Sequence, residues 1–161
     1  MKPKPFNVFF YWPERKDLVY MFGRCLVFFL LFYGVFGGAN FLASMHNYRI
    51  VGEFEFENYI PLVPIFSLVY FSGTFFLFLS PFLLRKDDQF IPFFKLLVLE
   101  LFIAAIFFIL LPIEIIDHVD ISEDTILGAI FNFNDKANLD YNYFPSLHVT
   151  FAFTLSFFVF E

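Results

Sequence analysis

Two side chains near the end of the sequence are of types that act together on phosphate. Ser146 and His148 follow Pro145 at the start of the last apolar stretch. Because the fixed φ of proline suits the first turn of a helix, we expect Ser146 to lie where free amides and the positive dipole end attract an anion. An imidazole can protonate a leaving alkoxide near neutral pH. The pair predicts a phosphate-binding serine and a histidine general acid; the same spacing also fits a helix-capping serine beside an interfacial histidine.

The segments that would position this pair are apolar enough to cross a membrane. Of the 161 residues, 60% are hydrophobic, whereas soluble domains average roughly 45–50%. An N-terminal arm at residues 1–17 precedes a transmembrane domain at residues 18–161. The sequence predicts an all-α integral membrane bundle of about four helices, with spans at residues 18–43, 59–84, 90–116 and 144–160.

Details of these spans give further expectations. Gly34 and Gly38 have the small-xxx-small spacing that lets a second helix approach closely. Pro61 and Pro64 are expected in the first turns of the second span, where a missing amide donor costs little. Residues 44–58 form a polar stretch in which Glu53, Glu55 and Glu57 alternate with Phe54 and Phe56, and we expect an interfacial loop there because a lone strand has no partner.

The polar stretch before the last span contains enough apolar residues, between Ile121 and Phe133, for a short helix along the membrane surface.

The charges of the loops predict the orientation of the chain in the membrane, because cytoplasmic loops carry an excess of Lys and Arg. With the N-terminus inside, eight basic residues lie on the cytoplasmic side and two outside: Lys2, Lys4, Arg15, Lys16, Arg24, Arg85, Lys86 and Lys95 against Arg49 and Lys136. We therefore expect Ser146 and His148 on the outer face, periplasmic or lumenal.

Composition argues against several other classes of protein. The net charge is −6, and no basic run is interleaved with aromatic residues, so nucleic acid is not an expected partner. A single cysteine, Cys25, rules out an internal disulfide framework and a cysteine-based metal site. We expect Cys25 to serve packing.

The residues around Ser146 resemble a known signature. A loop containing Asn138, Asp140 and Asn142 leads into Pro145-Ser146-Leu147-His148 and then into a membrane span. This order is similar to the second motif of the type 2 phosphatidic acid phosphatase superfamily. Leu before His, together with Ile60-Pro61-Leu-Val-Pro64 and Tyr70-Phe-Ser72, looks most like the branch that includes inositol phosphorylceramide synthase and related bacterial membrane proteins. The resemblance covers residues 20–161, and its specific part is residues 138–153.

The resemblance implies a fold, an activity and roles for residues. The fold would be part of a six-helix bundle, and the substrate a lipid phosphate within the bilayer. Ser146 would bind the phosphate and His148 would be the general acid. In this superfamily a later motif, Ser-Arg-x5-His-x3-Asp, supplies an arginine and a nucleophilic histidine that forms a phosphohistidine. Water or another alcohol resolves that intermediate, so phosphatase or phosphotransferase activity is implied, without a metal or other cofactor.

The sequence departs from this pattern in two places. The third motif is not found up to Glu161, so we expect the chain to be truncated, and inactive alone unless a separate chain or a downstream segment supplies that motif. The stretch from Pro112 to His118 also lacks the arginine of the first motif and carries Asp117 instead. His118 is a weak substitute if protonated. A non-catalytic remnant or a helical binding protein therefore stays open as the alternative, and the question of enzyme activity stays open with it.

Glu100 lies inside the third predicted span, where a carboxylate is costly and often functional. It is either a functional residue or a partner of an interfacial cation such as Arg24 or Lys95. A transporter or channel subunit is a third hypothesis, based on Glu100 and the glycines of the first span. His46, at the end of the first span, is expected at the interface rather than in a catalytic site.

Overall fold

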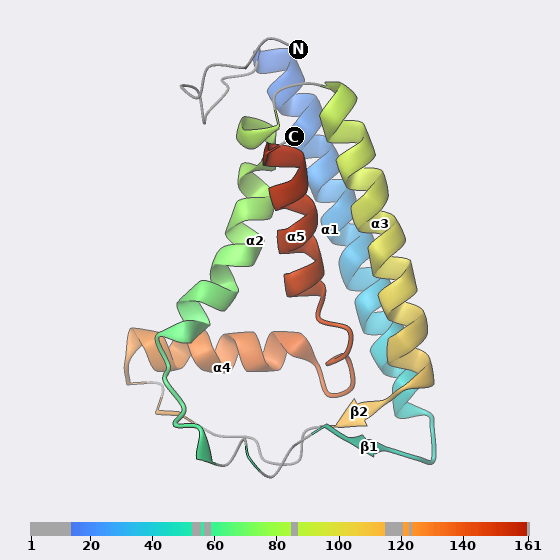
Figure 1. The fold of residues 1–161 in the computed structure, drawn as a ribbon, viewed down its shortest axis with the longest axis vertical. Coiled ribbons are helices and arrows are strands. Elements are labelled where there is room, and N and C mark those ends of the chain that lie inside the picture. The colour runs from blue at the N-terminus through green and yellow to red at the C-terminus, as the bar shows by residue number, and fades with distance from the viewer. Residues whose placement is uncertain are drawn as a thin grey trace.

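The computed structural model describes residues 14–52, 56, 59–84, 87–114, 121–122 and 124–160, and these are mostly helical (Figure 1). The longer helices run along the molecule and the shortest, α4, lies across one end (Figure 1). The helices are α1 (Arg15–Ser44), α2 (Phe66–Leu83), α3 (Asp87–Leu110), α4 (Ile126–Asn138) and α5 (Leu147–Phe160), and the two strands are β1 (Ile50–Val51) and β2 (Ile113–Glu114). The predicted helical class is confirmed.

Two of the described helices are long and apolar enough to cross a membrane, namely α1 and the Gln89–Leu110 part of α3. The 14 residues of α5 would extend roughly 21 Å at the rise of an α-helix, less than the hydrocarbon thickness of a bilayer. The 18 residues of α2 would extend roughly 27 Å. Apolar helices of membrane length are thus present, while the four-span arrangement stays a prediction.

Proline sets the ends of two helices. α2 begins at Phe66, so Pro61 and Pro64 precede it, and their predicted place in its first turns was wrong. The residue before a proline avoids the α region, which delays the helix until the second proline has passed. α3 ends at Leu110, two residues before Pro112, rather than at residue 116.

The core forms where α1 packs along α3 and α5 packs against α3, with Phe151 of α5 meeting Phe28 and Phe32 of α1. Small side chains bring α1 close to its neighbours at Ala39 and Ala43, which are buried. The predicted contact at Gly34 and Gly38 was wrong, because a Cβ at either position would meet nothing within 4 Å in the part of the chain that the structure describes. The fully buried side chains include Cys25, Phe90, Phe93, Leu97, Leu101 and Phe108.

A two-residue parallel pairing joins the segments that follow α1 and α3. Ile50 N donates to Pro112 O at 3.0 Å, and Gly52 N donates to Glu114 O at 3.1 Å. The segment after α1 was predicted as a loop because no partner strand was evident. The partner is β2, far along the sequence, whereas the alternating Glu53, Glu55 and Glu57 lie outside the described residues.

The short surface helix predicted over residues 121–133 is present as α4, shifted to Ile126–Asn138. Thr125 caps it, since its Oγ1 accepts a hydrogen bond of 3.1 Å from Gly128 N. Asn134 is buried, while Ile126 and Phe133 are 81% and 61% exposed. α4 therefore places amide groups against the bundle and apolar side chains outward.

Candidate functional site

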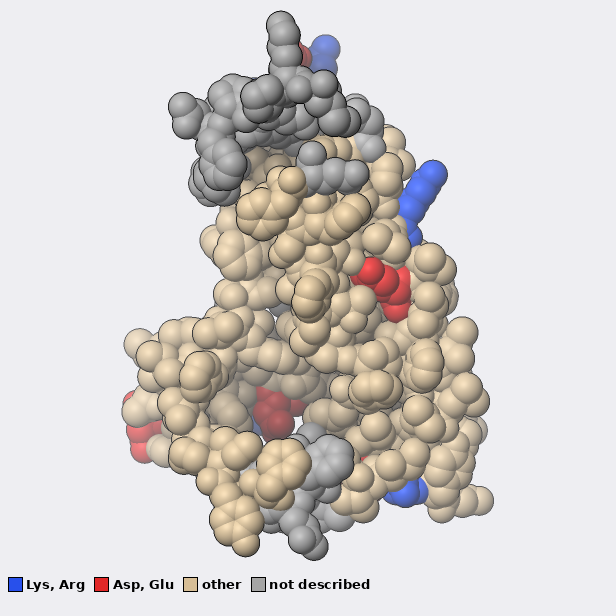
Figure 2. Space-filling view, viewed as in Figure 1, with Lys and Arg blue, Asp and Glu red and all other residues tan. Residues whose placement is uncertain are grey.

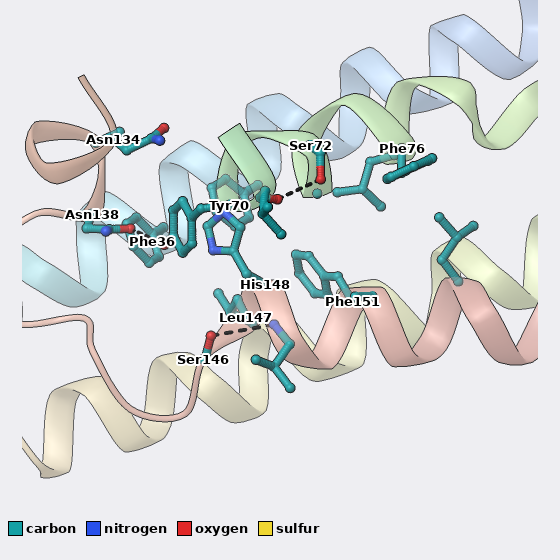
Figure 3. A pocket seen from close by; sticks show the side chains of 18 of the residues that line it. Phe36, Tyr70, Ser72, Phe76, Asn134, Asn138, Ser146, Leu147, His148 and Phe151 are labelled. Carbon is teal, nitrogen blue, oxygen red and sulfur yellow. Dashed lines mark hydrogen bonds between the residues drawn. The ribbon is translucent and has the colours of Figure 1, made fainter. Parts of the chain in front are cut away.

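A cavity of about 800 Å³ lies between α1, α2, α4 and α5. Most of its wall is apolar, and its polar groups come from α2, from α4, from α5 and the segment that leads into it, and from Tyr33 of α1 (Figure 3). The polar lining side chains are Tyr33, Tyr70, Ser72, Asn134, Asn138, Asn142, Tyr143, Ser146, His148 and Ser156. On the face of the molecule that Figure 2 shows, the surface is mostly uncharged, with charged side chains scattered over it. The cavity therefore suits an amphipathic ligand.

Ser146 lies immediately before the first residue of α5, Leu147. Its Oγ accepts a long hydrogen bond of 3.5 Å from Val149 N, which is the geometry of a weak N-cap (Figure 3). Pro145 therefore precedes the helix, and its predicted place in the first turn was wrong. Because capping uses only a lone pair, the hydroxyl proton of Ser146 remains available to a ligand in the cavity.

His148 is the second residue of α5. It is half-buried, and its ring lies in the cavity wall. The ring stacks on Tyr70, with centroids 3.8 Å apart and planes at 30° (Figure 3). Within the residues that the structure describes, neither ring nitrogen has a hydrogen-bond partner. A Cβ built on Gly73 would lie 3.5 Å from His148 Cδ2, so α2 passes close to the ring. The imidazole is therefore held by contact with α2 while its nitrogens stay free.

Two hydrogen bonds join α4 to α2 beside this stack. Tyr70 Oη donates to Asn138 Oδ1 at 2.5 Å, and Asn134 Nδ2 donates to Ser67 O at 3.1 Å. Asn134 and Asn138 lie four residues apart on one helix face, and Ser67 and Tyr70 lie three apart on another. These bonds fix the end of the cavity that carries the polar groups.

Two further hydrogen bonds attach the segment before α5 to α1. Asn142 is buried and donates through Nδ2 to Phe36 O at 2.8 Å. Tyr141 N donates to Asn40 Oδ1 at 3.0 Å. The chain that leads to Ser146 is thus held against α1, opposite the α2 side of the cavity.

Tyr143 also lines the cavity. Burial, together with the negative charges of Asp135 and Asp140 and the nearby Tyr70, raises the pKa of Tyr143 to about 12. The phenol is therefore a neutral hydrogen-bond donor at any physiological pH. The same carboxylates oppose an anion near Tyr143, and no Lys or Arg among the described residues lines the cavity.

Glu100, the acidic residue of the third predicted span, does not line the cavity. Its Oε1 accepts a hydrogen bond from the Thr154 hydroxyl between α3 and α5. The predicted alternative, a cation such as Arg24 or Lys95 as its partner, was wrong. Arg24 instead bonds the Tyr20 hydroxyl and lies over that ring. Glu100 is therefore part of the helix packing in this structure.

The remaining histidines are not brought to Ser146. His46 lies beside Tyr48 after the end of α1, with ring centroids 5.0 Å apart, and does not line the cavity. His118 and Asp117 lie outside the described residues. Of the predicted site residues, Ser146 and His148 alone are shown to share the cavity.

Sequence reasoning quoted Tyr70 and Asn138 only as parts of the resemblance and gave them no role. The signal that could have identified them is the pair Asn134 and Asn138, two amides four residues apart on one face of a short helix. That face had to meet another polar surface, because buried amides are almost always hydrogen-bonded.

Comparisons of the chain with family models, with curated proteins and with solved structures found no match. The likeness of residues 138–153 to the phosphatase signature therefore stands on the residues themselves. Membership of that superfamily stays a proposal.

Proposed function

We propose that this chain is a membrane protein of the type 2 phosphatidic acid phosphatase superfamily that binds a lipid phosphate in the cavity between α2, α4 and α5. The observation that supports the proposal is that Ser146 and His148 line one amphipathic cavity of about 800 Å³. The apolar wall would take the lipid chains, and the polar end would take the headgroup.

The chemistry assigned to each group follows from its atoms. The Ser146 hydroxyl donates to a phosphate oxygen, aided by the positive end of α5. Protonated His148 gives its proton to the alkoxide as the phosphorus–oxygen bond to the leaving alcohol breaks. Tyr143 adds a neutral donor.

The attacking nucleophile is not among the described residues that line the cavity, where His148 is the one histidine. In the superfamily a histidine of the third motif attacks phosphorus and forms the phosphohistidine. We therefore assign binding and leaving-group protonation to this chain. We propose that turnover uses a nucleophile from outside these described lining residues.

A second candidate is a non-catalytic membrane protein that binds a neutral amphiphile. It is favoured by the carboxylates of Asp135 and Asp140, which act on Tyr143, and by the lack of Lys or Arg among the described lining residues. Neutral donors contribute about half as much as charge-assisted ones, so a phosphate here would bind weakly. On this hypothesis diacylglycerol binds as well as phosphatidic acid.

The test is lipid binding by the full chain in nanodiscs, with phosphatidic acid and diacylglycerol as the two ligands. We expect the His148→Ala variant to weaken phosphatidic acid binding about tenfold, because a charge-assisted hydrogen bond is lost, and to leave diacylglycerol binding unchanged. His46→Ala is the matched control, since His46 lies outside the cavity. Equal binding of both lipids by the unaltered chain would favour the neutral-amphiphile candidate.

A further inference from the structure

We infer that Tyr70 is a positioning residue for His148, and that Asn138 holds Tyr70 in place from α4. The geometry supports the positioning by itself. Its consequence for headgroup binding rests on the function proposed above.

The imidazole of His148 is oriented by a ring contact and not by a hydrogen bond within the described residues. His148 has no hydrogen-bond partner in the described part of the chain, so no polar contact sets the rotation of its ring. The ring instead lies against Tyr70 at 3.8 Å between centroids. A hydrogen bond would orient the ring by occupying a nitrogen, whereas a stack orients it and leaves both nitrogens for ligand and proton. This arrangement suits a histidine that must be both held and reactive.

Tyr70 is itself held in place by a hydrogen bond to α4. Its hydroxyl donates to Asn138 Oδ1 at 2.5 Å, at the last residue of α4. One turn away, Asn134 bonds Ser67 O at 3.1 Å, so α4 holds α2 at two successive points. A phenol fixed at its hydroxyl has little freedom to tilt, and the ring that His148 rests on is thereby anchored.

One face of α2 contacts both α4 and α5. Ser67, Tyr70 and Gly73 recur every three residues and therefore share one helix face. α4 meets this face at Ser67 and Tyr70, and α5 meets it at Tyr70 and Gly73. At Gly73 a Cβ would lie at ordinary contact distance, 3.5 Å, from His148 Cδ2. Tyr70 is thus the residue through which the surface helix α4 reaches the histidine of α5.

The experiment reads the orientation of His148 directly by nuclear magnetic resonance of ¹³C-histidine in the full chain. A ring stacked on a phenol is shielded, so we expect the His148 ring protons to move downfield in Tyr70→Leu and to stay shielded in Tyr70→Phe. Tyr33→Leu is the matched control, because Tyr33 lines the same cavity and, among the described residues, its ring pairs with Phe32 rather than with His148.

A second comparison tests the link to α4. Tyr70→Phe and Asn138→Ala each remove the same hydrogen bond, so we expect equal small shifts of the His148 resonances and no further shift in the double variant. These two variants keep the phenyl ring and keep the inference testable if Tyr70→Leu does not fold. His148 resonances that are unchanged in Tyr70→Leu, or that move equally in Tyr33→Leu, would overturn the inference.

Lipid binding separates this inference from the proposed function. If both hold, Tyr70→Leu weakens phosphatidic acid binding severalfold and Tyr33→Leu does not. If the His148 resonances move in Tyr70→Leu while His148→Ala leaves phosphatidic acid binding intact, the positioning is supported and the phosphate-binding role is overturned.

Discussion

At the scale of single residues, Ser146 combines two uses of one hydroxyl. Its oxygen accepts from Val149 N at 3.5 Å, and its proton is left for a ligand. A serine that only caps a helix and a serine that also binds a phosphate therefore respond differently to substitution.

Replacing Ser146 in two ways separates these uses. Ser146→Ala should lower stability by about 0.5–2 kcal/mol through loss of the cap and should weaken phosphatidic acid binding. Ser146→Asp should keep the cap and abolish phosphatidic acid binding, because a carboxylate repels phosphate. Thermal unfolding followed by circular dichroism and lipid titration give the two readouts.

Ser146→Thr is the matched control, since it retains the hydroxyl. Phosphatidic acid binding by Ser146→Asp that equals binding by the unaltered chain would show that Ser146 serves the helix alone.

At the scale of elements, α4 determines the shape of the polar end of the cavity. It begins at a Thr125 cap and closely approaches the preceding segment at Gly128, where an added Cβ would lie 2.1 Å from Ser122 O. That distance is far below van der Waals contact and involves backbone, so the approach requires glycine.

We expect Gly128→Ala to displace the start of α4 and Thr125→Ala to weaken it by about 1 kcal/mol. Both should raise hydrogen exchange over residues 126–138, with Gly128→Ala having the larger effect. Thr125→Ser keeps the cap and serves as the control. Exchange over α1 should not change, and a rise there equal to that in α4 would contradict an independent role for α4.

The sequence predicted helices better than the contacts between them. Apolar runs identified α1 and α3, and a mixed stretch identified α4, because these patterns are local. The bond from Tyr70 to Asn138 joins residues 68 apart, and no local spacing encodes it. The start of α2 was predicted too early. Pro61 and Pro64 were assigned to its first turns, whereas the helix begins after both prolines, at Phe66. Ser146 and His148 were found because they are two residues apart in one helix start.

At the scale of the whole molecule, orientation in the membrane is a prediction from charge. In a Cys25→Ala background, we expect Asp140→Cys to react with a membrane-impermeant maleimide added outside intact cells. Lys16→Cys should react only after permeabilisation, because eight of the ten basic residues are predicted inside. Both positions are exposed in the structure. The reverse labelling pattern would place Ser146 on the cytoplasmic face.

The β1–β2 pairing divides the molecule into a fixed part and an adjustable part. Backbone bonds from Ile50 and Gly52 join the segments beyond α1 and α3, and Tyr48 Oη adds a bond of 2.8 Å to Leu110 O at the end of α3. Two helices tied at one end and packed along their length cannot slide past each other without breaking these bonds. We therefore expect any adjustment of the cavity to ligands of different size to involve α2 and α4, which are joined to each other by the hydrogen bonds of Asn134 and Asn138.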